Sequence, residues 1–363
     1  MTFPLWFYVG VFALSALFST AALAFARRRQ LVDIPNARSS HNLPTPKGGG
    51  IGFAVLISLI LLIAGAASNT ATGVYVLMLG SAALALSITG LVDDLRPLPS
   101  ATRLVIQLLA GIAILFFLPT TAIDLGFMRL PQTAFICLAL LFLLWTTNLY
   151  NFMDGIDGIA CAQAILLGAA IYSLDALGFY SGELAHLGLA IAACLGGFLL
   201  FNFPPAKMFM GDAGSVFLGF TLGAMALFET ATAAENLWIW LILLAVFVCD
   251  ATATLVSRLV QGQKFYQAHR SHIYQLYTRS IEERLRRAGM ADEQARARAH
   301  RRYLLLFSLF FCLIQFPLAT AVAAHWLPGL LVTLLTYGLL LGGFMLLGAG
   351  RDRLFFYRGI RKK

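Results

Sequence analysis

Eleven runs of apolar residues, separated by short polar stretches, divide the chain from end to end. A membrane-spanning helix needs about 20 mostly apolar residues to cross the hydrocarbon core. Leu104–Leu118 and Gly214–Phe228 are shorter than this, and the other runs approach or exceed it. The pattern predicts an all-α, polytopic integral membrane protein with about eleven transmembrane helices. The predicted helices are Phe3–Ala26, Gly48–Ala67, Gly73–Val92, Leu104–Leu118, Pro131–Asn148, Ile159–Leu177, Leu184–Phe203, Gly214–Phe228, Leu237–Val256, Tyr303–Ala323 and Leu327–Leu347.

The composition agrees with a membrane protein. Of the 363 residues, 60% are hydrophobic and only 12% are charged, which a soluble domain does not match. The five cysteines lie inside apolar runs without paired spacing, so no disulfide framework or zinc site is indicated. Because no internal repeat is visible, we treat residues 1–363 as a single transmembrane domain.

The basic residues are sorted between alternate connections. Of the 26 lysines and arginines, only Arg129 lies outside one set of alternate connections and the C-terminal tail. Connections rich in Lys and Arg remain in the cytoplasm. With eleven helices, this predicts a periplasmic N-terminus and a cytoplasmic C-terminus. The net charge of +9 is explained in this way, and no nucleic-acid partner is expected.

The same connections carry the polar motifs. The predicted cytoplasmic loops are approximately 27–50, 93–103, 148–158, 202–215 and 258–302. Five polar motifs at one membrane face indicate one shared site. A transporter or flippase for a phosphorylated lipid, the alternative from another class, would place polar breaks near the midplane and on both sides.

The central motif is Asn148–Gly158, between two apolar runs. Acids at a membrane edge are costly and therefore mark candidate functional sites. Asn148, Asn151, Asp154 and Asp157 follow one another at intervals of three residues, which on a helix places neighbouring side chains roughly on one face. A polar turn between two helices is the simpler interpretation, but such a turn needs only one or two of these groups.

The candidate side chains suit phosphate chemistry. Carboxylate and amide oxygens are typical ligands of Mg²⁺ or Mn²⁺. Glycine-rich turns before the second and eighth apolar runs could bind phosphate through backbone N–H groups. Lys47, Arg96, Lys207 and Arg270 lie close to the motifs and could neutralise phosphate oxygens. Together these features indicate phosphoryl transfer at a membrane face.

Several motifs also have a purely structural interpretation. Asp93 and Asp94 could simply end a helix, and Asp212 could cap the next one. Asp250 could reach the aqueous edge or pair with a nearby arginine. Glu282–Arg302, rich in Arg and Ala, is expected to form an amphipathic surface helix that contacts anionic lipid and has no catalytic role.

Taken together, the motifs resemble the polyprenyl-phosphate N-acetylhexosamine-1-phosphate transferase family. Any one of them would be weak, but they occur in the family's order and span nearly two-thirds of the chain. The matching stretches are Pro44–Gly49, Asp93-Asp94, Asn148–Gly158, Asn202–Ser215 and His269–Gln275.

The resemblance implies three groups of site residues. The catalytic group is Asp93, Asp94, Asp154, Asp157, His269 and His272. The substrate-binding group is Lys47, Asn148, Asn202, Lys207, Phe209 and Arg270. The metal-binding group, with Mg²⁺ as the cofactor or Mn²⁺ in its place, is Asp212, Asn151 and Asp157.

The resemblance also implies an activity. An N-acetylhexosamine-1-phosphate would pass from a UDP-sugar to undecaprenyl phosphate, with release of UMP, at the cytoplasmic face of a bacterial inner membrane. This reaction would start a lipid-linked glycan such as the O-antigen of lipopolysaccharide or another cell-envelope polysaccharide. Membrane lipids, and a second copy of the chain as a homodimer, are the other expected partners.

The histidine motif bears on the donor sugar. The phospho-MurNAc-pentapeptide translocase of peptidoglycan synthesis, the alternative within the family, has a run of three histidines. Here the motif reads His-Arg-Ser-His-Ile-Tyr-Gln from His269. This departure favours a small N-acetylhexosamine donor and leaves the particular sugar open.

The charge distribution makes the topology testable. A cytoplasm-active reporter fused to either end should give a signal only at the C-terminus, because the basic connections hold alternate loops in the cytoplasm. A signal from both ends would contradict the eleven-helix arrangement.

Overall fold

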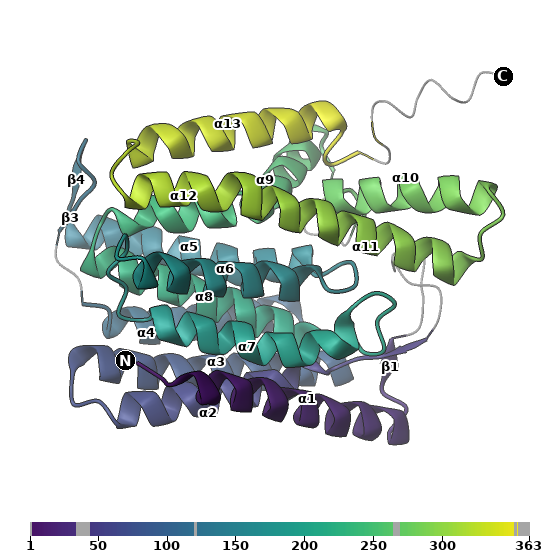
Figure 1. Ribbon diagram of the computed structural model, residues 1–363, viewed down its shortest axis with the longest axis horizontal. Helices are drawn as coiled ribbons and strands as arrows, with labels where there is room; N and C mark the ends of the chain where they lie inside the picture. Colours follow the sequence, from purple (N-terminus) through teal and green to yellow (C-terminus); the bar gives the residue numbers. More distant parts are fainter. Residues whose placement is uncertain (1, 34–43, 120–121, 264–268, 352–353, 355–363) are drawn as a thin grey trace.

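The computed structural model describes residues 2–33, 44–119, 122–263, 269–351 and 354. Most helices lie side by side along one direction (Figure 1). They are α1 (Leu5–Arg28), α2 (Gly50–Ala66), α3 (Ala71–Leu95), α4 (Ser100–Phe116), α5 (Gln132–Met153), α6 (Ile159–Ala176), α7 (Ala185–Asn202), α8 (Asp212–Thr232), α9 (Asn236–Val260), α10 (Ile273–Arg287), α11 (Asp292–Phe310), η1 (Phe311–Gln315), α12 (Phe316–Ala323) and α13 (Gly329–Leu347). Two short antiparallel hairpins pair β1 (Val32–Asp33) with β2 (Thr45–Pro46) and β3 (Ile123–Asp124) with β4 (Arg129–Leu130).

Each predicted apolar run contains a helix in the described part of the chain, which confirms an all-α, polytopic membrane protein. Nine described segments are long and apolar enough to cross a membrane, and the 17-residue helices α2 and α4 are shorter. Gly214–Phe228 is the interior of α8, which has 21 residues and is therefore not short. The tenth predicted helix, Tyr303–Ala323, begins earlier than expected. Helices α11, η1 and α12 form one continuous 32-residue segment, Asp292–Ala323, whose first residues were predicted to lie in a loop.

Helix α8 lies at the centre of the bundle. In its most apolar stretch 94% of the residues are buried, compared with 28% for α1 and 17% for α13 at the periphery. Glycines allow this close packing: a Cβ on Gly219 would lie 2.4 Å from the Thr146 carbonyl oxygen of α5. A Cβ on Gly50 of α2 would likewise lie 2.4 Å from the Cα of Gly214. Small residues at such crossings let helix backbones approach within a membrane.

The connections that carry the polar motifs lie at one end of the bundle, at the right in Figure 1, and β3 and β4 lie at the opposite end. Main-chain hydrogen bonds join two of these connections directly. Gly49 N donates to Phe209 O at 3.0 Å, and Phe209 N donates to Pro46 O at 2.8 Å. The turn before α2 is thus fixed against the turn before α8. Helix α1 begins at the left end and α13 ends at the right, although which end faces the cytoplasm stays a prediction (Figure 1).

Two sequence-based expectations are corrected. Asn148 and Asn151 lie on α5, but this helix ends at Met153, so Asp154 and Asp157 belong to a loop instead of the same helical face. The loop turns at Gly158, where the φ angle of +80° suits glycine.

The segment Glu282–Arg302 is not one surface helix. It forms the end of α10, a turn and the start of α11, so the two helices make a hairpin at the end where the motifs meet. Arg284, Arg287 and Arg298 are exposed, as expected, but Arg296 and His300 are only 3% and 1% exposed. The pattern was misread because the face of α11 that carries Ala295, Arg296, Ala299 and His300 packs on the protein.

Candidate active site

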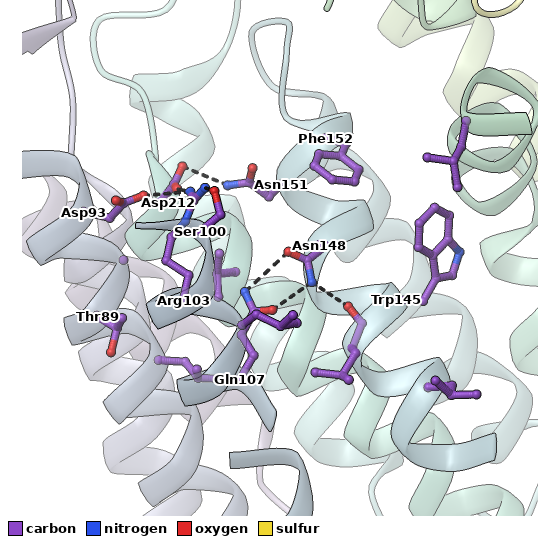
Figure 2. A pocket seen from close by; sticks show the side chains of 17 residues that line it. Thr89, Asp93, Ser100, Arg103, Gln107, Trp145, Asn148, Asn151, Phe152 and Asp212 are labelled. Carbon is purple, nitrogen blue, oxygen red and sulfur yellow. Dashed lines mark hydrogen bonds and ion pairs between the residues drawn. The ribbon is translucent and has the colours of Figure 1, made fainter. Parts of the chain in front are cut away.

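A cavity of about 510 Å³ lies where the cytoplasmic ends of several helices were predicted to meet. Its walls come from α3, α4, α5, α8 and α9. Figure 2 shows its charged groups gathered on one side and Asn148 and Gln107 beside one another below them. The residues that line it are Leu86, Thr89, Gly90, Asp93, Ser100, Arg103, Leu104, Gln107, Leu141, Leu144, Trp145, Asn148, Asn151, Phe152, Asp212, Val216 and Leu255.

Arg103 is the centre of the charged group. Its Nη1 lies 2.9 Å from Oδ2 of Asp93 and 3.4 Å from Oδ2 of Asp212. Asn151 donates from Nδ2 to Oδ1 of Asp212 at 2.8 Å and to Oγ of Ser215 at 3.1 Å. Four helices, α3, α4, α5 and α8, therefore supply one continuous polar network (Figure 2). The network brings together Asp93, Asn151 and Asp212, which the sequence indicated as site residues. It also includes Arg103 and Ser215, which were not predicted site residues.

The start of α8 explains why Asp212 is placed here. Gly211 has a φ angle of +68°, which turns the chain into the helix. Oδ2 of Asp94 accepts a hydrogen bond from Ala213 N at 3.3 Å and so caps the exposed amides of this helix. Gly90 leaves room for the turn, because a Cβ there would lie 2.5 Å from Asp212 O. Asp94 thus lies beside Asp212 but faces the helix start.

Below the charged group, an amide pair crosses from α4 to α5. Asn148 Nδ2 donates to Gln107 Oε1 and to Leu144 O, both at 2.8 Å. Apolar side chains of the cavity wall, including Leu141 and Trp145, follow towards the middle of the bundle. The cavity therefore has a charged head and a largely apolar wall.

Asp154 is the acid that ends α5. Burial raises its pKa well above the ordinary value, and the negative charges of Asp212, Asp157 and Asp94 raise it further. Protonation would remove one negative charge from this crowded group. A cation bound beside Asp154 would instead lower the pKa of this side chain and favour its carboxylate form.

Asp157 is turned away from the charged group. Its Oδ2 lies 3.4 Å from His300 Nδ1 and accepts a hydrogen bond from Ala206 N at 3.1 Å. Burial alone would raise the pKa of Asp157, but the hydrogen bond and charge of His300, with the charge of Arg296, lower it. Both contacts engage Oδ2, and the assignment of Asp157 as a metal ligand stays a prediction.

The residues predicted to contact the donor occupy the neighbouring connections. Asn202 is buried, accepts from Gly158 N at 3.0 Å and donates to Met208 O at 3.0 Å, so it joins the two loops. Lys207 is exposed and Phe209 is half-buried. Lys47 precedes the turn that pairs with Phe209. Of the predicted site residues, only Asp93, Asn148, Asn151 and Asp212 line the cavity itself.

The histidine motif lies at the start of α10. Burial and the nearby positive charges of His272 and Arg258 lower the pKa of His269 to about 4, so this ring is neutral at pH 7. His272 is buried with Nδ1 3.3 Å from Oδ1 of Asp250. Arg270 is half-buried beside them. The motif therefore offers the neutral ring of His269, the ring of His272 beside Asp250, and one half-buried arginine.

Asp250 caps α10 from outside that helix. Its Oδ1 accepts from Ile273 N at 2.9 Å, and its Oδ2 accepts from Tyr274 N at 3.2 Å. The sequence had suggested only that Asp250 reaches the aqueous edge or pairs with a nearby arginine. A carboxylate on one helix that caps another could not be recognised from local spacing.

The oxygen donors fit a magnesium ion in part. Among the residues that the structure describes, no group of three or more His, Cys, Asp or Glu side chains is arranged to hold a metal. Asp93 and Asp212 nevertheless face the same guanidinium group. Mg²⁺ commonly takes one or two carboxylates and completes its shell with substrate phosphates and water. These two acids suit that coordination, and a requirement for magnesium stays a prediction.

Sequence reasoning missed Arg103 and Gln107. Both lie on α4, one turn apart on the same face. This helix begins a few residues after the Asp93-Asp94 pair. A basic residue in the first turn of an apolar helix, soon after an acid pair, was the signal that could have identified Arg103.

Comparison with known proteins places the chain in a family. A model of glycosyl transferase family 4 matches residues 74–230, which include every cavity residue except Leu255. A probable undecaprenyl-phosphate N-acetylglucosaminyl 1-phosphate transferase from Bacillus subtilis is 30% identical over 258 residues, 67% of this chain and 68% of the relative. The chain belongs to this family.

Two further relatives differ in the substrates that their names give. A decaprenyl-phosphate N-acetylglucosaminephosphotransferase from Mycobacterium leprae is 25% identical over 346 residues, 85% of this chain and 82% of the relative. A phospho-N-acetylmuramoyl-pentapeptide-transferase from Prochlorococcus marinus is 30% identical over 236 residues, 59% of this chain and 60% of the relative. The relatives named for an N-acetylglucosamine donor and the relative named for a MurNAc-pentapeptide donor therefore have similar sequence identity to this chain.

The contacts of Arg103 predict an effect on stability. Arg103→Ala should lower the Tm of the purified protein by a few degrees at pH 8, because Asp93 and Asp212 lose their shared cation, a partly exposed contact worth up to about 1 kcal/mol. Differential scanning fluorimetry measures this shift. The exposed Arg96 is the control, and an Arg103→Ala protein as stable as Arg96→Ala would contradict the interpretation.

Proposed function

We propose that the chain transfers an N-acetylhexosamine-1-phosphate from a UDP-sugar to a polyprenyl phosphate and releases UMP. The observation that carries this proposal is the cavity, which combines a charged head with an apolar wall. Along α5 the lining runs from Phe152 to Leu141, or roughly 16 Å at 1.5 Å per residue. A polyprenyl phosphate has a matching division between a charged phosphate and an apolar tail.

In the proposed complex the acceptor phosphate lies at the head of the cavity. Arg103 would donate hydrogen bonds to it, and the first isoprene units would pack against Leu104 and Leu144 below. The Gln107–Asn148 amide pair lies between these regions and would face the phosphoester oxygen. The Bacillus subtilis and Mycobacterium leprae relatives are named for undecaprenyl phosphate and decaprenyl phosphate, which is consistent with this placement.

The chemistry follows from the charges. An oxygen of the acceptor phosphate would attack the β-phosphorus of the UDP-sugar, and the bond from that phosphorus to the bridging oxygen would break, so UMP leaves. A magnesium ion at Asp93 and Asp212 would neutralise the diphosphate oxygens. Asn151 orients Asp212 for that task. A phosphate monoester loses its second proton near pH 6, so the acceptor needs little help from a general base at neutral pH.

We propose a small UDP-N-acetylhexosamine as the donor. The His-Arg-Ser-His-Ile-Tyr-Gln motif supports this choice over a MurNAc-pentapeptide donor. Lys47, Lys207 and Phe209 lie in the connections next to the cavity and would meet the uridine diphosphate part. The proposal includes undecaprenyl phosphate as the acceptor, the cytoplasmic face of the inner membrane as the location and an envelope polysaccharide such as O-antigen as the product pathway.

A transporter is the less favoured alternative. The polar groups of the described cavity gather at one end, and its deeper wall is largely apolar. A path for a phosphorylated head group would need polar groups across the membrane. The one-sided arrangement therefore favours transfer at a face.

The donor can be identified with purified protein. Undecaprenyl phosphate and a panel of UDP-sugars should give UMP release with at least one simple UDP-N-acetylhexosamine. Turnover of UDP-MurNAc-pentapeptide alone would move the chain to the peptidoglycan branch. Absence of UMP release with every UDP-sugar of the panel would leave the transferase proposal without support.

The role of Asp212 can be tested through binding as well as turnover. Asp212→Asn should reduce UMP release by about 10³-fold or more, since a charge-neutralising ligand acts mainly on the transition state. With UMP present, Mg²⁺ should raise the Tm of the wild-type protein but not that of Asp212→Asn. Full activity in EDTA, or an active Asp212→Asn protein, would rule out this role.

A further inference from the structure

A buried polar contact outside the cavity joins the α10–α11 hairpin to the Asp154–Gly158 loop. His300 of α11 is 1% exposed and Asp157 is 3% exposed. The His300 Nδ1 atom lies 3.4 Å from Oδ2 of Asp157 and 3.4 Å from the backbone N of the same residue. The other ring nitrogen lies 3.6 Å from Oε1 of Glu282 on α10. The imidazole therefore touches both helices of the hairpin and both the side chain and the main chain of Asp157.

The contact extends into the connection between α7 and α8. Oδ2 of Asp157 also accepts from Ala206 N at 3.1 Å. Arg301, the neighbour of His300, donates from Nε to Pro204 O at 2.8 Å, and its guanidinium lies 6.0 Å from the centre of the Phe203 ring. Residues 203–206 are thus held by α11 directly and through Asp157. This connection leads to Phe209 and to the start of α8.

The hairpin itself is firmly placed. Asp250 of α9 caps the first turn of α10. Tyr274 of α10 donates from its hydroxyl to Phe152 O at 2.9 Å. A Cβ on Gly155 would lie 2.1 Å from the same hydroxyl oxygen, so glycine is required for this fit. An anchored hairpin can position a loop, whereas a mobile one could not.

We infer that His300 is a positioning residue, which fixes Asp157 and, through it, the two connections that flank the donor side of the active site. The inference rests on the proposed function for its kinetic readout only. Buried contacts to a charged group are worth several-fold to about a hundredfold in an equilibrium when one partner is removed. Because His300 does not line the cavity, its loss should affect donor binding more than the acceptor.

The kinetic test compares full-length variants in detergent. His300→Ala should raise the KM for the UDP-sugar that the wild type uses by about tenfold, and leave the KM for undecaprenyl phosphate within about twofold. Arg298→Ala changes an exposed residue of the same helix and is the matched control. The double variant with His300→Ala and Asp157→Asn should have a KM for the UDP-sugar close to that of the more affected single variant, because the two side chains act as one unit. Additive effects, or equal changes in both KM values, would overturn the inference.

A structural test does not depend on turnover. In an Ala206→Cys background, the rate of labelling by a maleimide should rise about fivefold when His300→Ala is added, because residues 203–206 lose their anchor. Arg298→Ala should leave the rate unchanged. If His300→Ala does not purify as a folded protein, His300→Gln replaces it in both tests.

The two readouts separate the two proposals. An inactive wild type with faster labelling in the His300 variant would count against the transferase proposal alone. An active wild type with unchanged KM and unchanged labelling in His300→Ala, or in His300→Gln where that replaces it, would defeat the positioning role.

Discussion

The pairing of acids at the membrane edge is the interaction on which the site depends. Asp93 and Asp212 come from different helices and face one another across Arg103. Carboxylates in such surroundings are costly unless a cation or a helix terminus offsets their charge. The single positive charge of Arg103 offsets part of the charge of Asp93 and Asp212, and Asp94 faces the amides that begin α8. A site that gathers acids in this way suits a cation together with a diphosphate, because the cation would offset the charge of both the acids and the phosphates.

Helix α8 connects the group of acids to the centre of the bundle. Its first residue is Asp212, and glycines on α2, α3 and α8 itself allow neighbouring backbones to come within contact distance. Larger side chains at Gly50 or Gly90 would separate the helices and move Asp212 with them. The packing of the membrane core and the position of the charged groups are therefore set by the same small residues.

The hairpin of α10 and α11 adds a second layer of support. The family model matches residues 74–230 and so covers almost the whole cavity, whereas Asp250, Tyr274 and His300 lie beyond it. Tyr274 contacts the end of α5 and His300 contacts the loop that follows it, whereas Asp250 caps α10, and none of the three lines the cavity. The hairpin thus supports the loop after α5 from outside the cavity, and Arg284, Arg287 and Arg298 on its outer face are exposed.

The sequence by itself determined the eleven apolar segments, the all-α class and the set of polar motifs, because helix length and hydrophobicity in a membrane are local properties. It also singled out Asp93, Asn151 and Asp212, which the fold brings into one network. Only the tertiary structure decided which residues these side chains contact. Arg103, Asp250 and His300 act across helices distant in sequence, and Asp157 faces His300 because α5 ends at Met153. Such contacts depend on how helices cross, which no local spacing of residues encodes.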